Sequence, residues 1–429
     1  MADTGTAQTT AQTTKGYLRI LVIAGLVGLP VSVAAFAFLA LLHALTAVVW
    51  ESLPEAMGHD LPPWWWPLPW LALAGVLVGA VIRYLPGRGG GVPVDGLGLE
   101  EVPASHLPGV LLTALAGLPL GVVLGPEAPL VALGSGLALL LVRPWPATLA
   151  APGGRLLAAA GASAAIAAIF GSPLVAAVFV LEAVGLARPA LTRVVLPCLL
   201  SAGVGALVFT GLGSWTGLGI AALSVPPFEA PPRPDVGDIL WTVPLAAVVA
   251  LGAREVRRLG RWVAPKAQQR PWPWAVGVAV LAGVCASAYA LLTGRSPQDV
   301  ALSGQQLLAP LLDDPAAWSL GALAALIGFK ALAYGASLGA LRGGAIFPVV
   351  LLGAAVGLLA SGLPAYGAVP AIAGGMAAAT TAITRLPVVS AVLTVLLLAS
   401  DAAAIAPVVL IAVVVAFVVA QAGDRDRSS

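Results

Sequence analysis

Long apolar stretches, separated by short polar breaks, dominate the chain from residue 17 onward. The first stretch, 17–49, exceeds the roughly 20 residues that a helix needs to cross a bilayer, which predicts a tilted membrane helix. Several later stretches are shorter than a full crossing. The predicted membrane helices occupy 17–49, 65–85, 108–124, 128–143, 155–170, 173–187, 191–213, 238–253, 273–293, 317–337, 346–360, 367–383, 386–399 and 403–421.

Glycine and proline interrupt these stretches often, with 50 Gly and 36 Pro in 429 residues. Broken helices at membrane depth are tolerated only where they are buried in protein or line a water-filled cavity. The pattern therefore predicts an all-α integral membrane protein of broken, tilted helices that surround a transport pathway.

The composition agrees with this class, because 59% of the residues are hydrophobic and only 9% are charged. Soluble domains carry about 25% charged residues. A net charge of +2, without a basic tract, argues against a nucleic-acid partner. Two cysteines, Cys198 and Cys285, and three histidines cannot supply a recognisable metal centre, so we expect no metal and no cofactor.

The ends of the chain and its basic residues predict its orientation. Residues 1–15 are expected to form a disordered tail, 16–423 a single membrane domain, and 424–429 a polar tail with no soluble regulatory domain. The positive-inside rule places the strongest basic cluster in a cytoplasmic loop. We expect a multi-pass protein of the cell membrane with both termini in the cytoplasm. The cluster is Arg254, Arg257, Arg258, Arg261, Lys266 and Arg270.

An internal repeat is the most informative feature. The segment 125–134 (GPEAPLVALG) aligns with 344–353 (GAIFPVVLLG), and Gly161 to Val178 aligns in the same order with Gly375 to Val392. One match could arise by chance in a chain rich in Ala, Val, Leu and Gly, but two collinear matches that include proline favour a duplication. We expect repeat halves at about 65–215 and 270–423, with the substrate site between them.

Glu127 lies in an interrupted segment, Gly125-Pro-Glu-Ala-Pro129, that precedes an apolar run. Proline suits the first turn of a helix, so Glu127 is expected at a helix N-terminus within the membrane. The unpaired N–H groups there carry partial positive charge and attract an anion. Gly343 to Pro348 repeats this design without the carboxylate, which leaves the amides of Ile346 and Phe347 for a diffusible anion.

Backbone dipoles suit a halide, since they replace its hydration shell without holding it as tightly as a full positive charge. Ionised Glu127 would occupy the amides and block the path; protonated, it would swing away. An intramembrane carboxylate is a functional hypothesis by default. The alternative is a glutamate that only caps a helix.

Three short motifs resemble the hallmark segments of the CLC family of chloride channels and proton-coupled chloride antiporters. They are Gly89-Gly-Gly-Val-Pro93, Gly125-Pro-Glu-Ala-Pro129 and Gly344-Ala-Ile-Phe-Pro348. Each motif alone is weak, but their order and spacing are fairly specific. The run Phe170 to Glu182 and the stretch Ser400 to Pro407 also resemble family segments, so the likeness covers about 17–420.

The resemblance implies an inverted-repeat helical fold of a prokaryotic type without CBS domains, and a homodimer with one pore per subunit. It implies that Glu127 is the gating glutamate and that protons can be a second substrate. It also implies anion coordination by backbone amides, namely those of Gly90, Gly91, Val92, Ile346 and Phe347.

Departures from the family pattern leave the transport mode open. Gly90 replaces the usual serine, and the usual inner-gate tyrosine is missing because the last tyrosine is Tyr366. Ala183 stands where the family has its inner proton-transfer glutamate, so Glu182 is the candidate relay. The alternatives are anion/proton antiport, an uncoupled channel gated by voltage or pH, and selectivity for fluoride or nitrate.

Two other features have simpler interpretations. Gly335-Ala-Ser337-Leu-Gly339 matches a hydrolase nucleophile pattern, but no histidine motif accompanies it, so small residues for helix packing are favoured and no enzyme is expected. Lys330, Arg342 and Arg385 are expected to be cations at loop ends or at the membrane surface.

Overall fold

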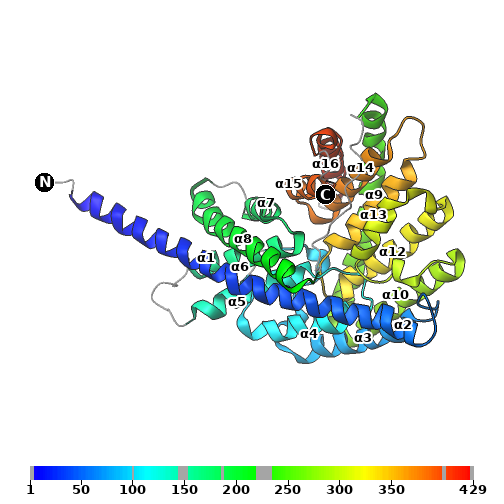
Figure 1. Cartoon of the computed structure of the whole chain (residues 1–429), viewed down its shortest axis with the longest axis horizontal. Coiled ribbons are helices and arrows are strands. Elements are labelled where there is room, and N and C mark those ends of the chain that lie inside the picture. Colours follow the sequence, from blue (N-terminus) through cyan, green and yellow to red (C-terminus); the bar gives the residue numbers. More distant parts are fainter. Residues whose placement is uncertain are drawn as a thin grey trace. The chain divides into compact units, whose positions relative to one another are not determined.

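The computed structural model describes residues 4–98, 101–143, 153–184, 188–218, 234–398 and 402–425. Within these ranges the chain is helical, and its one β-bridge joins Gly125 and Gly344. Figure 1 labels the α-helices. They are α1 (Thr4–Ala47), α2 (Leu53–Ala56), α3 (Pro67–Tyr84), α4 (Leu107–Gly117), α5 (Glu127–Val142), α6 (Gly153–Phe170), α7 (Pro173–Val184), α8 (Arg188–Thr216), α9 (Val236–Gln269), α10 (Pro271–Thr293), α11 (Gln305–Asp313), α12 (Leu320–Ala340), α13 (Ile346–Ala360), α14 (Ala368–Thr384), α15 (Pro387–Leu397) and α16 (Ala402–Arg425).

Each predicted membrane stretch corresponds to one of these helices. Among the described residues, 7 helices are long and apolar enough to cross a membrane, and the others are shorter apolar helices such as α5, α13 and α14. The prediction of an all-α membrane protein with broken helices is confirmed. The short helices α2 and α11 have no counterpart among the predicted stretches, because their sequences are too short to stand out by hydropathy.

The chain forms two compact units where the sequence predicts one domain. The first comprises Met1–Ala40, Gly98–Leu107 and Leu130–Ala222, and the second comprises Leu41–Leu97, Pro108–Pro129 and Leu223–Ser429. Their boundaries do not follow the predicted repeat halves. Glu127 and the helices from α9 to α16 belong to the second unit.

The repeat is visible in how its glycines pack. In the first unit a Cβ on Gly161 would collide with the carbonyl oxygen of Gly134, and in the second a Cβ on Gly375 would collide with that of Gly353. These glycines occupy equivalent positions in the repeat. Both halves therefore use glycine to bring two short helices into backbone contact, α5 with α6 and α13 with α14.

The equivalent glycines Gly125 and Gly344 bond to each other directly. The amide of Gly125 donates to the carbonyl of Gly344 (2.8 Å), the amide of Gly344 donates back (2.5 Å), and the bridge is antiparallel. A reciprocal contact between equivalent residues is what a local two-fold axis produces. The two repeat segments thus run in opposite directions, as an inverted repeat requires.

Helix α9 corrects the expectation of a basic cytoplasmic loop. It continues to Gln269 through the arginine cluster, where the sequence predicts a helix end near residue 253. Buried Ala253, Gly260, Val263 and Ala264 recur at helical spacing and keep one face apolar, which is why the helix extends. Helix α9 packs against α12, α14 and α16 (Figure 1).

Helix α1 begins at Thr4, within the predicted disordered tail. Extending an existing helix by one residue is far easier than nucleating a new one. The apolar stretch from residue 17 therefore allows the preceding Thr/Ala/Gln residues to adopt helical geometry.

Candidate functional site

The carboxylate of Glu127 lies on the N-terminus of α13. Its Oε1 atom accepts hydrogen bonds from the amides of Ile346 (3.1 Å) and Phe347 (2.7 Å), and all three residues are buried. Glu127 is the first residue of α5 and Ile346 the first of α13, so they are equivalent in the repeat. One half thus supplies an anionic side chain to the helix N-terminus of the other half.

Two glycines make room for this carboxylate. A Cβ atom added to Gly125 or Gly344 would overlap its oxygen atoms. The second carboxylate oxygen, Oε2, is buried and has no hydrogen-bond partner in the described part of the chain. A buried charge of this kind is costly unless its lone pairs are satisfied. Oε2 is therefore the atom on which a proton would remove the charge without disturbing the two amide bonds' geometry.

Tyr334 holds the start of α13 from the neighbouring helix α12. Its hydroxyl donates to the carbonyl of Ala345, the residue just before α13 (2.6 Å), and its side chain is fully buried. This bond fixes the backbone immediately before the amides that meet Glu127. Sequence analysis missed Tyr334, because a tyrosine within an apolar helix reads as ordinary core.

The glycine-rich loop of the first motif is tied to the third motif by Arg342. The Arg342 Nε donates to the carbonyl of Arg88 (3.2 Å), and its Nη1 to the carbonyl of Leu341 (3.0 Å). Arg342 is buried, not the surface cation that the sequence predicts, because these carbonyls replace water. Burial and the nearby charge of Arg88 lower the pKa of Arg342 to about 10, so it stays charged at neutral pH.

The predicted amides of this loop differ in their surroundings. The amide of Gly90 donates to the carbonyl of Gly87 (2.9 Å), and Gly90 adopts a φ of 103°, which a side chain would strain. Gly91 is exposed, and Val92 leads into Pro93. The turn therefore uses the Gly90 amide, and Gly91 and Val92 remain as predicted anion contacts.

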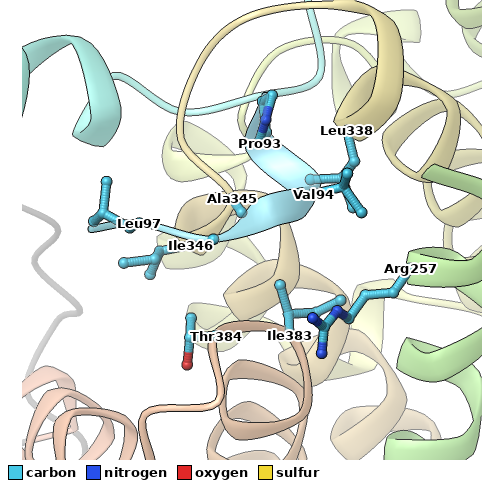
Figure 2. A pocket seen from close by; sticks show the side chains of 10 residues that line it. Pro93, Val94, Leu97, Arg257, Leu338, Ala345, Ile346, Ile383 and Thr384 are labelled. Atoms are coloured by element: carbon cyan, nitrogen blue, oxygen red, sulfur yellow. The ribbon is translucent and has the colours of Figure 1, made fainter. Parts of the chain in front are cut away.

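A cavity lies beside the start of α13, and Figure 2 shows the residues around it. Its empty space is about 300 Å³. Four segments that are distant in sequence meet here: the loop after the first motif, α9, the junction of α12 with α13, and the end of α14. The lining residues are Pro93, Val94, Gly96, Leu97, Arg257, Leu338, Ala345, Ile346, Ile383 and Thr384.

Arg257 is the one cationic side chain that lines this cavity. It is half-buried, and its Nη1 makes a long hydrogen bond to the carbonyl of Ala382 (3.5 Å). Sequence analysis assigned it to a cytoplasmic loop as part of a charge cluster. The signal that could have found it is position: buried residues recur around it with the period of a helix.

Lys330 and Ser337, both on α12, are also fully buried. The Lys330 ammonium donates to the carbonyls of Asp299, Val300, Ala301 and Leu302 at 3.0–3.3 Å, so the prediction of a surface cation is wrong. Four carbonyls replace its water. The Ser337 hydroxyl donates to the carbonyl of Ala333 in mid-helix, unlike the exposed turn that a nucleophile needs.

The remaining predicted residues lie apart from this geometry. Glu182 is half-buried near the end of α7, in the first compact unit, so its role as a relay stays a prediction. Arg385 ends α14 with a φ of 63° and is half-buried. Ser400 and Asp401 fall outside the described residues.

Comparison with known proteins places this geometry in context. The sequence model of the family described as "Voltage gated chloride channel" matches residues 80–421. The protein named "Putative ion-transport protein YfeO" from Salmonella schwarzengrund (strain CVM19633) is 29% identical over 350 residues, which is 78% of each chain. Its namesake from Salmonella paratyphi A (strain ATCC 9150 / SARB42) is 28% identical over 348 residues, again 78% of each chain.

Two solved structures share the fold. A slow cyanobacterial Cl⁻/H⁺ antiporter superimposes with a TM-score of 0.71 at 20% identity and covers 94% of both chains. A CLC-type fluoride/proton antiporter gives 0.71 at 16% identity, with 94% of this chain and 96% of the other. The alignments extend over nearly the whole helical domain.

Proposed function

Because the chain belongs to the CLC family of voltage gated chloride channels, we propose that it carries chloride or a similar small inorganic anion across a membrane, with Glu127 as the gate. The observation that carries the proposal is the pair of hydrogen bonds from Ile346 and Phe347 to the Glu127 carboxylate. A carboxylate seated on a helix N-terminus occupies the place where a free anion would bind.

The gate follows from competition for these amides. Ionised Glu127 holds both N–H groups and excludes a diffusible anion. A proton on Oε2 neutralises the carboxylate, weakens its attraction to the positive end of α13, and lets an anion take its place. Low pH therefore favours anion entry, and each opening brings one proton to the site.

Exchange of anions for protons is the mode we favour, and an uncoupled channel is the alternative. The similar structures named above are a Cl⁻/H⁺ antiporter and a fluoride/proton antiporter, which supports exchange. Ala183 at the usual inner glutamate position favours weak coupling, with Glu182 or water as the relay. Gly90 in place of the usual serine leaves fluoride and nitrate as alternative substrates.

The assembly and orientation complete the proposal. Family resemblance supports a homodimer with one pore in each subunit. The arginines on α9 support a cytoplasmic position for the end of that helix, and hence for both termini.

Flux measurements on purified protein in liposomes test the proposal. With an outward chloride gradient and the membrane potential clamped by potassium and valinomycin, we expect chloride efflux that quickens as the pH falls. Proton uptake against its own gradient would support exchange, and chloride efflux without proton movement would support the channel.

Glu127→Gln isolates the gate, since glutamine has the same shape but cannot ionise. We expect chloride flux that no longer responds to pH and no coupled proton movement. If the variant keeps the full pH response, Glu127 is not the gate. If neither protein moves chloride, fluoride or nitrate, the proposed function is wrong.

A further inference from the structure

The cavity at the start of α13 joins two helix ends of opposite polarity. Ile346 contributes the positive N-terminus of α13, while Ile383 and Thr384 contribute the last turn of α14. The unpaired carbonyls of a helix C-terminus carry partial negative charge. An anion that leaves the Ile346 and Phe347 amides through this cavity would therefore be repelled by α14.

Arg257 lies where it can offset that repulsion. Figure 2 shows its side chain reaching from α9 to Ile383, and its Nη1 bonds the carbonyl of Ala382 in the last turn of α14. The guanidinium has five N–H donors, and one long bond to a carbonyl leaves others directed at the cavity. Apart from the Thr384 hydroxyl, the other side chains that line the cavity are apolar.

We infer that Arg257 makes this cavity a second anion-holding station, beside the amides that Glu127 occupies. This inference rests on the proposed transport function and adds a side-chain cation to it. The station would take a small monovalent inorganic anion, held between the guanidinium and the N-terminus of α13. Because the carbonyl of Ala382 and the α14 dipole already share the positive charge, the anion is held less tightly than by a bare guanidinium.

Chloride binding by the purified, full-length protein tests the inference independently of transport. Arg257→Gln removes the charge, and Arg258→Gln is its matched control. Arg258 is the next residue on the same helix, its side chain is 62% exposed, and it pairs with Glu255. Chloride affinity is measured from the chloride-dependent rise in melting temperature, with gluconate at equal ionic strength as the reference.

We expect Arg257→Gln to weaken chloride binding about tenfold or more, as for the loss of a hydrogen bond to a charged group. Arg258→Gln should stay within about twofold of wild type, as for an exposed ion pair. Equal effects in both variants, or no effect of Arg257→Gln, would overturn the inference. A lower melting temperature with unchanged chloride affinity would reduce Arg257 to a cap for α14 and would also overturn it.

Thr384→Glu provides a second test should Arg257→Gln fail to fold. It adds an opposing carboxylate to the cavity wall and leaves Arg257 in place. We expect weaker chloride binding and slower chloride efflux, and unchanged affinity would contradict the inference. The proposed function fails separately, since in that case the wild-type protein in liposomes would move no anion at all.

Discussion

Gly344→Ala is the substitution that probes the Glu127 seat most sharply. A Cβ at residue 344 would overlap Oε2 of Glu127, so the carboxylate must leave the α13 amides. It would give up two hydrogen bonds, of 3.1 Å and 2.7 Å. Each such bond to a charged group contributes about 1.5–3 kcal/mol, and because the two share one oxygen we expect a combined loss of about 3 kcal/mol. This corresponds to roughly a 100-fold lower occupancy of the seat by the carboxylate.

The assay is chloride efflux from liposomes between pH 4.5 and 7.5. In the wild type, efflux should rise as the pH falls, because protonation of Glu127 frees the amides. In Gly344→Ala the carboxylate is already displaced, so efflux at pH 7.5 should increase and the pH response should flatten. Gly91→Ala is the control, since a Cβ there meets nothing within 4 Å.

A double-mutant cycle separates displacement of the carboxylate from damage to the backbone. Glu127→Ala removes the group with which the new methyl collides. Gly344→Ala should therefore change efflux little in the Glu127→Ala background. Equal effects in both backgrounds, or a wild-type pH response in Gly344→Ala, would refute the reasoning.

Three further substitutions test residues around the site. Lys330→Met leaves four buried carbonyls without their donor and should lower the free energy of unfolding by about 3 kcal/mol, measured by denaturation in detergent; a change below about 0.5 kcal/mol would contradict this. Arg342→Gln removes the donor to the Arg88 carbonyl, so amide hydrogen exchange at residues 86–91 should quicken, and unchanged exchange would contradict the tether. Gly90→Ser forces a side chain to a φ of 103°, which should cost about 1–2 kcal/mol of unfolding stability and raise chloride permeability relative to nitrate. Unchanged stability and unchanged relative permeability would contradict that prediction.

The membrane helices could be predicted from the sequence because hydropathy and Gly/Pro breaks are local signals. The repeat was also readable, since Gly125, Glu127 and Gly134 recur 219 residues later as Gly344, Ile346 and Gly353. These alignments led directly to the helix start at Ile346. What the repeat could not give is which amides the Glu127 carboxylate would meet, since that depends on packing across the local two-fold axis.

Buried cations were the main failure of sequence reasoning. Lys330, Arg342 and Arg257 were all assigned to the surface or to a loop, because a charge in an apolar chain is usually solvated. In each case backbone carbonyls from distant segments replace water: those of 299–302 for Lys330, that of Arg88 for Arg342 and that of Ala382 for Arg257. Such contacts arise only from tertiary structure and leave no periodic signal.

The central claim is that Glu127 and the transported anion compete for the amides of Ile346 and Phe347. Anomalous diffraction from bromide-soaked crystals of the wild type at neutral pH and of Glu127→Gln tests it most directly. The account predicts a bromide peak within hydrogen-bond distance of both amides in Glu127→Gln, and a much weaker one in the wild type. Equal peaks there in both proteins, or no peak at these amides in the variant, would contradict it.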